Sequence, residues 1–154
     1  MPRRPIFEVR RSPIQGLGVF ATRTIRRGTR IGTYSGEYLT EDEVNRRYDD
    51  DSPARATTFL FQVSDSLYVD AEREGGDARY INHSCDPNCA SEVVGTEVVI
   101  RAIRTIPAGA EITYDYALQL EDDPLPSWPQ LYACRCGAVS CRGTMLDPES
   151  RPKD

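Results

Sequence analysis

The sequence predicts a mainly β fold, an α+β domain with few helices. Most regular segments are short runs of β-branched and aromatic residues, and glycine, proline, asparagine and aspartate turns separate them. Only one segment carries a clear helix start signal. With 154 residues, of which 39% are hydrophobic, the chain can bury the core of one compact domain.

The first half of the chain is expected to contain three strands, one helix and then a hairpin. The helix begins at Thr40, because the Thr40 and Glu43 side chains can form a capping box, and it ends near Tyr48 after two arginines. The strands before the helix are expected at Phe7–Arg10, Leu17–Thr22 and Arg30–Tyr34, and the hairpin strands at Thr57–Val63 and Leu67–Asp70.

A second hairpin and a final strand are expected in the second half. Gly95-Thr96 joins Glu92–Val94 to Glu97–Ile103, and a glycine in the first loop position favours a type II′ turn. After the turn at Pro107-Ala108-Gly109, a strand is expected at Glu111–Thr113. Residues Gln119–Leu131, which are rich in proline and acids, are expected to form an irregular linker.

The five cysteines are candidate zinc ligands, three near the C-terminus and two in the central motif. Cys134, Cys136 and Cys141 form a C-x-C-x4-C cluster, which leaves a tetrahedral site one ligand short. Cys85, Cys89 or His83 can supply the fourth ligand, and we favour Cys85. Free buried cysteines or disulfides are the alternatives, although the two members of C-x-C are too close for an unstrained bridge.

Composition narrows the class of protein. No apolar stretch approaches the roughly 20 residues of a membrane span, and the basic start lacks the apolar core of a signal peptide. A reducing cytoplasmic location is therefore expected, or a nuclear or nucleoid one if the substrate is histone-like. The net charge of −5 argues against nucleic-acid binding through the chain's own field and favours a basic polypeptide partner. The oligomeric state has no sequence signal.

Five motifs in a fixed order resemble those of the SET-domain protein lysine methyltransferases, over residues 6–146. They are Gly16-Leu17-Gly18, Tyr34-Ser35-Gly36-Glu37, Arg79 to Asn88 with Asn82-His83-Ser84-Cys85 inside it, Glu111 to Tyr116, and the C-terminal cysteines. The resemblance implies a β-clip of small sheets whose segments 80–83 and 113–116 meet in a pseudoknot. It also implies a SET domain at 1–118 and a post-SET linker, zinc loop and tail at 119–154. The pre-SET cysteines of many relatives are absent.

The resemblance implies S-adenosylmethionine as the methyl donor and one structural Zn²⁺. The donor would be held by Gly16, Leu17 and Gly18, by Asn82 and by the main chain at His83. Met145 or Leu146 would cover the adenine, where relatives often carry an aromatic residue. Taken alone, the glycines and the histidine are more often structural, and the roles of Arg79 and Cys89 stay open.

Methyl transfer to lysine requires a neutral amine aligned with the donor, and an aromatic channel promotes this by desolvation. By resemblance, Tyr116 is the catalytic tyrosine and Tyr34 lies near donor and lysine. Tyr114 would limit the product to mono- or dimethyllysine. Without the motifs, all three read as ordinary aromatic core.

The resemblance places the substrate peptide beside Thr57–Val63, where it would be a histone tail, a DNA-packing protein or a ribosomal protein. Acidic residues Asp49, Asp50, Asp51 and Asp65 could favour such a peptide, although they also suit a solvated loop. The alternative is a catalytically weak SET-like zinc module that binds basic tails. A zinc hydrolase is excluded if four cysteines close the coordination sphere.

Overall fold

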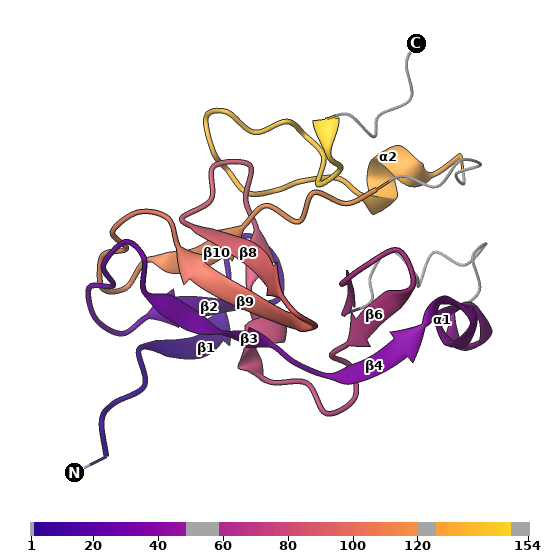
Figure 1. Cartoon of the computed structure of the whole chain (residues 1–154). Coiled ribbons are helices and arrows are strands. Elements are labelled where there is room, and N and C mark those ends of the chain that lie inside the picture. The colour runs from indigo at the N-terminus through magenta and orange to yellow at the C-terminus, as the bar shows by residue number, and fades with distance from the viewer. Residues whose placement is uncertain (1, 49–58, 120–125, 149–154) are drawn as a thin grey trace.

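The computed structural model describes residues 2–48, 59–119 and 126–148, and within these ranges the chain forms two β-sheets with little helix (Figure 1). The predicted mainly β fold is confirmed. The larger sheet has the order β1-β2-β10-β8-β9-β3, with β7 added beside β10, and the smaller sheet has the order β4-β6-β5. The strands are β1 Phe7–Arg11, β2 Leu17–Ala21, β3 Arg30–Tyr34, β4 Glu37–Thr40, β5 Leu60–Gln62, β6 Leu67–Asp70, β7 Asn82–His83, β8 Cys89–Val94, β9 Glu97–Ala102 and β10 Glu111–Tyr114.

The predicted helix is present as α1, Glu41–Arg47. The Thr40 hydroxyl accepts a hydrogen bond from the Glu43 backbone N–H, and the Glu43 carboxylate accepts one from the Thr40 backbone N–H. These two bonds satisfy donors that the first helical turn leaves free. Val44 is fully buried, so the helix packs one side against the small sheet.

Both predicted hairpins are confirmed, with changed ends. β5 and β6 pair antiparallel, although residues 57 and 58 of the first predicted strand lie outside the described residues. β8 and β9 pair antiparallel from Val94 opposite Glu97, and β8 begins at Cys89 rather than at Glu92. Gly95 has φ +65° and Thr96 has no positive φ, as a type II′ turn requires.

Four elements had not been predicted as helix or strand: β4, β7, the 3₁₀ helix at Asp77–Tyr80 and α2. β4 begins at Glu37, the last residue of the Tyr34 motif, where the sequence had given no strand signal. The linker expected to be irregular contains a one-turn helix, α2, at Trp128–Leu131. Pro129 lies in its first turn, where its missing N–H costs no helical hydrogen bond, so the proline is compatible with the helix start.

The two distant motif segments meet as the resemblance implied. β7 runs parallel to β10, with Asn82 opposite Thr113 and His83 opposite Tyr114. The Asn88 side chain reinforces the junction, because its amide donates to the Glu111 carbonyl at 2.8 Å and its oxygen accepts from the Thr113 N–H at 3.0 Å. One side chain thus bonds to β10 as a neighbouring strand would.

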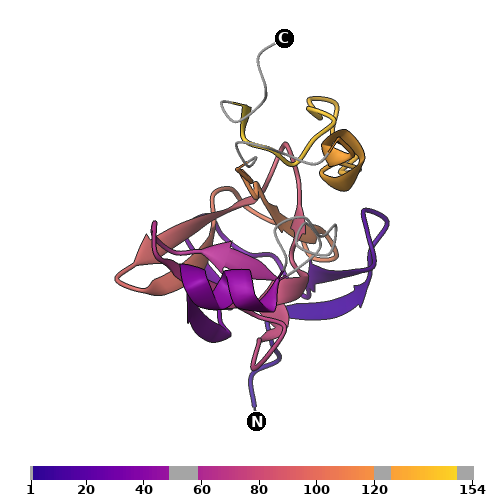
Figure 2. The ribbon, with the colours of Figure 1, turned by 90° about the vertical axis from the view of Figure 1, so that its right-hand side faces the viewer.

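The core combines aliphatic residues of the larger sheet and its connecting segments with Val69 of β6 and Ala71 just after it, and it includes Tyr34 and Tyr114. Its fully buried members include Val19, Ile81, Val98, Ile100, Ile106 and Ile112. The cysteine-rich loop and α2 lie together above the strands in both views (Figures 1 and 2). No helix in the described ranges has the length and apolar character needed to cross a membrane.

Candidate functional site

Three tyrosines singled out in the sequence lie in one aromatic cluster. The ring centroids of Tyr114 and Tyr116 are 4.9 Å apart, and Phe61 links this pair to Tyr34, at 6.4 Å from Tyr114 and 5.4 Å from Tyr34. The rings come from β3, β5 and β10 and the residues just after it. Residues from both sheets therefore build one aromatic site, in which Phe61 was not predicted.

The hydroxyl groups of this cluster remain protonated at neutral pH. Burial raises the pKa of Tyr34, Tyr114 and Tyr116 well above the usual value near 10. The Tyr34 hydroxyl donates to the Phe59 carbonyl at 2.6 Å, and the Tyr116 hydroxyl donates to the Ile81 carbonyl. The Tyr114 hydroxyl has no hydrogen-bond partner among the described residues, so it remains available to a ligand.

The glycine motif lies beside an open cavity. The cavity has a volume of about 440 Å³ and is lined by Arg11, Ser12, Gly16 and Leu17. That volume lies within the range of small-molecule sites. Gly16 has φ +46°, a left-handed conformation that favours glycine.

A carboxylate that the sequence reasoning missed holds this region together. Glu111 accepts hydrogen bonds from the Ser12 hydroxyl at 2.7 and 2.9 Å and from the Asn82 amide at 2.9 Å. The same Asn82 amide reaches the Leu17 carbonyl at 3.0 Å. A Cβ added at Gly18 would collide with the Glu111 carboxylate, so glycine is needed there for packing. Glu111 thus connects β1, the glycine turn and the strand pair β7-β10.

His83 connects the aromatic cluster to the cysteines. Its Nδ1 accepts a hydrogen bond from the Tyr116 backbone N–H at 2.9 Å, so the ring proton is on Nε2, which lies 3.4 Å from Cys85 Sγ. Burial lowers the pKa of His83 to about 4, against a smaller opposing effect of the Asp115 carboxylate, and the ring is neutral at pH 7. The side chain orders the backbone at Tyr116 and is buried from solvent.

Four cysteine sulfurs gather where a zinc site was expected. Those of Cys85, Cys134, Cys136 and Cys141 all lie within 4.8 Å of one another. Cys85 Sγ is 3.7 Å from Cys134 Sγ and 4.0 Å from Cys141 Sγ. These separations are too long for disulfides and match the roughly 3.8 Å between sulfurs around a tetrahedral zinc with 2.3 Å bonds. The donor set therefore fits Zn²⁺, and Cys85 is the residue that joins the three C-terminal thiols.

A second link ties the cysteine loop to the tyrosine strand. Arg142 pairs with both oxygens of Asp115, at 2.9 and 3.1 Å, and donates to the Leu146 carbonyl at 3.2 Å. Burial raises the pKa of Asp115, but the Arg142 hydrogen bonds and charge together with the Ala117 N–H outweigh it, and the pKa is lowered. A bidentate pair of this kind fixes orientation as well as distance. Asp115 lies between Tyr114 and Tyr116 in the sequence. This position inside the motif is the sequence feature from which a structural role for Asp115 could have been predicted.

The structure also places the residues left open by the sequence. Cys89 is buried in β8 and takes no part in the cysteine cluster. Leu146 is fully buried and bridges to Leu118, whereas Met145 remains partly exposed and is the better placed of the two to cover a ligand. Arg79 donates to the Ala71 carbonyl and the Tyr80 hydroxyl, at 3.1 and 2.7 Å, which indicates a structural role.

The expected peptide-binding strand lies at a sheet edge. β5 pairs only with β6 among the described strands and is therefore an edge strand of the described part of the small sheet, the position at which a peptide strand can add. Asp65 is exposed in the turn after β5. Asp49, Asp50 and Asp51 lie outside the described residues.

Known proteins resemble this chain throughout the site. Residues 16–117 match the SET domain. The chain is 38% identical over 139 residues to Histone-lysine N-methyltransferase 2D of Homo sapiens, covering 88% of this chain and 2% of that protein. It is 41% identical over 147 residues to Histone-lysine N-methyltransferase mes-4 of Caenorhabditis elegans, covering 85% and 16%. It is 37% identical over 150 residues to Histone-lysine N-methyltransferase set1 of Dictyostelium discoideum, covering 93% and 10%. The chain thus spans a small part of each relative's length.

Proposed function

Because this chain belongs to the SET domain family, we propose that it is a protein-lysine N-methyltransferase that uses S-adenosylmethionine and acts on a basic protein. The observation that carries the proposal is the convergence of Tyr34, Tyr114 and Tyr116 in one cluster. A module that only binds tails has no need of three clustered tyrosines on this scaffold, two of them buried and the third partly buried. The relatives' names support a histone or histone-like acceptor and, with it, a nuclear location.

The donor site is assigned to the cavity beside Gly16 and Leu17, with Gly18, Asn82, the main chain at His83 and Met145 as further contacts. Gly16 and Gly18 let the backbone come close to a ligand, and Glu111 keeps Asn82 beside the glycine turn. When bound, S-adenosylmethionine supplies an electrophilic methyl group on a positively charged sulfur.

The aromatic cluster prepares the acceptor amine. Desolvation by Phe61 and the tyrosines disfavours the lysine ammonium and lowers its pKa. The Tyr116 hydroxyl donates to Ile81, which leaves its oxygen lone pairs to contact the incoming amine. Tyr34 is held by Phe59 in the same way, so both hydroxyls are fixed before substrate binds.

Tyr114 is assigned to product control. Its hydroxyl has no partner among the described residues and can hold the amine or a water, which narrows the space for a third methyl group. The expected product is therefore mono- or dimethyllysine.

The four cysteines are assigned to a structural zinc site. Four thiolates complete a tetrahedral sphere and leave no position for a reactive water, so the metal would stabilise the C-terminal loop. That loop then contacts the active site through His83 and the Arg142 pair with Asp115.

The test is methylation of a panel of histones, DNA-packing proteins and ribosomal proteins by the purified chain with S-adenosylmethionine, followed by mass spectrometry. The wild type should add methyl groups, each of which raises the substrate mass by about 14 Da, and Tyr116→Phe should abolish this mass gain. Tyr38→Phe is the matched control, because Tyr38 is exposed and its hydroxyl bonds to Thr96 on the surface. If neither methylation nor binding of S-adenosylmethionine occurs, the chain is a module that binds basic tails, and the proposal is wrong.

A further inference from the structure

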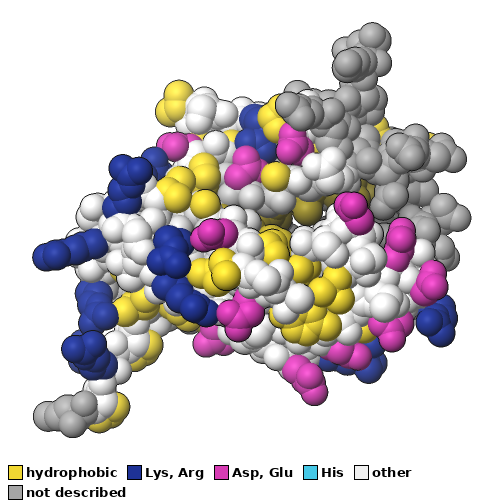
Figure 3. Space-filling view, viewed as in Figure 1, with side chains coloured by type: hydrophobic (Ala, Val, Ile, Leu, Met, Phe, Trp, Pro, Cys, Tyr) yellow, Lys and Arg dark blue, Asp and Glu magenta, His cyan; other side chains and the backbone are white. Residues whose placement is uncertain are grey.

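The net charge of −5 conceals a strong separation of charge along the chain. Residues 1–36 contain eight arginines and one acid, a net charge of +7, and residues 37–154 contain 11 basic and 23 acidic residues, a net charge of −12. Basic side chains gather on the left of the surface and acidic ones mainly on the right and lower edge (Figure 3). The average charge therefore says little about any one face.

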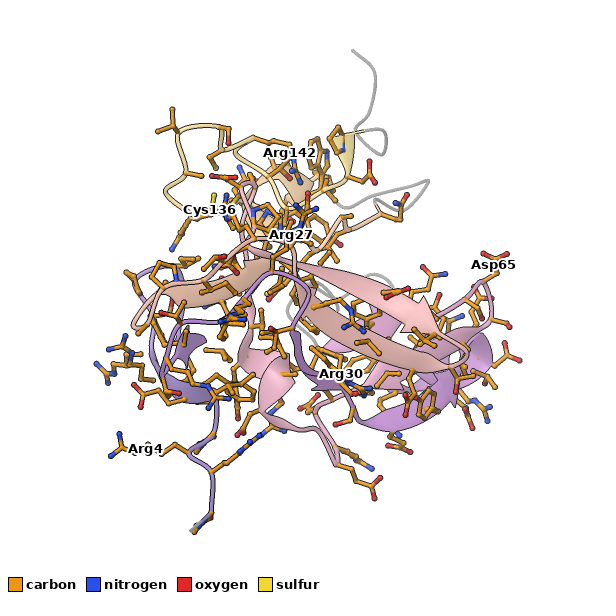
Figure 4. The ribbon with its side chains drawn as sticks, turned by 60° about the vertical axis from the view of Figure 1, so that its left-hand side comes forward. Arg4, Arg27, Arg30, Asp65, Cys136 and Arg142 are labelled. Carbon is orange, nitrogen blue, oxygen red and sulfur yellow. The ribbon has the colours of Figure 1, made fainter. Side chains whose placement is uncertain are left out.

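Backbone contacts bring the arginines of this basic region together. The Thr22 hydroxyl and N–H donate to the carbonyls of Pro5 and Ile6, so Arg4 and Arg23 belong to adjoining segments. A bridge between Ile25 and Ile106 and a bond from the Gly28 N–H to Ala102 hold the next loop against β9. Figure 4 shows Arg27 and Arg30 near the middle of the view and Arg4 at its lower left, whereas Asp65 lies at the right-hand edge. We call the surface of Arg4, Arg23, Arg26, Arg27, Arg30 and Arg101 the basic face.

The basic face has few internal counter-charges. Arg26, Arg27, Arg30 and Arg101 form no ion pair within the described part of the chain. Arg30 on β3 stands directly opposite Arg101 on β9. Like charges opposite each other in an antiparallel pair destabilise the sheet. An external anion bound beside Arg30 and Arg101 would reduce this repulsion.

We propose that the basic face binds the phosphate backbone of duplex DNA. Guanidinium groups pair with phosphate oxygens through two parallel hydrogen bonds, and a surface spread over three segments suits a repeating anion. The stretch from Thr22 to Arg30 exposes no large hydrophobic side chain, which an acidic protein partner would use as an anchor. The DNA contact would hold the enzyme next to a DNA-packing substrate, a consequence that rests on the proposed function although the binding itself does not.

The test is fluorescence anisotropy of a labelled 20-base-pair duplex (about two helical turns) with the purified chain across a range of salt concentrations. Arg26→Gln/Arg27→Gln is the test variant, because neither side chain makes a hydrogen bond or ion pair with a described residue. Arg46→Gln/Arg73→Gln removes the same charge from exposed positions outside the basic face and is the matched control. The assay contains no S-adenosylmethionine, so its result is independent of catalytic activity.

The wild type should bind with an affinity that falls steeply as salt rises. Loss of two phosphate contacts should reduce the slope of log K against log salt by about 1.8 and weaken binding about 60-fold at 0.1 M salt. The control variant should keep most of the wild-type affinity. Absence of binding at 50 mM salt (roughly a third of physiological strength), equal losses in both variants, or equal competition by polyglutamate would each overturn the proposal.

Discussion

Asp70 is buried in a charged network that attaches α1 to the small sheet, and its removal gives a test of how the aromatic site is held. The carboxylate is fully buried and accepts hydrogen bonds from Arg47 at 3.1 Å, the Tyr48 hydroxyl at 2.6 Å and the Glu72 N–H at 3.0 Å. The next residue, Ala71, donates its N–H to the Phe59 carbonyl, which in turn accepts the Tyr34 hydroxyl. Asp70 therefore supports the position of Tyr34 through two intermediates.

The loss of unfolding free energy expected for Asp70→Asn depends on which hydrogen bonds the partners of Asp70 retain. An asparagine retains one acceptor oxygen, so either the Glu72 N–H on Oδ1 or the two donors on Oδ2, Arg47 and Tyr48, lose their acceptor. Breaking a buried ion pair costs about 3–5 kcal/mol, but the Arg47 side chain is 25% exposed and still pairs with Glu37 at 2.9 Å. The Tyr48 hydroxyl, which has a single proton, can donate it to the Glu72 carboxylate at 2.9 Å instead. We expect a loss of about 2 kcal/mol in the free energy of unfolding, or roughly 4–8 °C in Tm.

The loss should depend on pH in a defined direction. Burial alone would raise the pKa of Asp70, but the hydrogen bonds from Tyr48, Glu72 and Arg47 outweigh it and lower the pKa. A lowered folded-state pKa stabilises the fold above the ordinary aspartate value near 4, and this stabilisation is lost as the pH falls through the folded-state pKa. The difference between wild type and Asp70→Asn should therefore be largest at neutral pH and shrink below about pH 4.

Urea unfolding at pH 7 and at pH 3 (both chosen around the ordinary pKa of about 4) measures both effects. Asp86→Asn is the matched control, because Asp86 pairs with Arg104 at 3.2 Å while its side chain is 58% exposed, and such pairs contribute less than about 1 kcal/mol. If the two variants lose the same stability at pH 7, or if the Asp70 loss grows on acidification, the reasoning is refuted.

Three further predictions concern the site itself. Tyr114→Phe should shift the product toward trimethyllysine, as measured by mass spectrometry; an unchanged product distribution would exclude Tyr114 as the switch. Glu111→Gln should weaken S-adenosylmethionine binding about tenfold in calorimetry, with a smaller effect on Tm, because the tie between Ser12 and Asn82 loses its charge. Cys136→Ser should lower bound zinc measured by atomic absorption, whereas Cys89→Ala should retain it; equal zinc loss in both would contradict the assigned ligand set.

Local chemistry in the sequence was enough to predict α1 and most of the strands. The capping box at Thr40 and the turn at Gly95 depend on neighbouring residues only, so their signals survive folding. β4 and α2 were missed for the opposite reason. β4 is held by pairing with β6, and α2 is a single turn joined to the cysteine loop through Tyr132, which accepts the Met145 N–H. Neither stabilising partner is visible in the local sequence.

The cysteines of the candidate site were predicted from their spacing and zinc chemistry, and the tyrosines because their motifs resemble those of a known family. The supporting residues were not, because their meaning lies in contacts between distant segments. Glu111 reads as an ordinary strand carboxylate until Ser12, 99 positions away, is placed beside it. Phe61 reads as one aromatic in a strand until the small sheet brings it between Tyr34 and Tyr114.

The segment from Asn82 to Cys85 explains why the separate parts of the site depend on one another. Asn82 bonds to the glycine turn, His83 bonds to the Tyr116 backbone, and Cys85 belongs to the cysteine cluster. Four consecutive residues thus contact the assigned donor site, the tyrosine cluster and the zinc ligands. If β7 ran in the opposite direction, or paired with β10 one residue out of register, these side chains would face the wrong partners, because alternate residues of a strand face opposite sides. The parallel register of β7 with β10 is therefore the feature on which all three parts of the site depend.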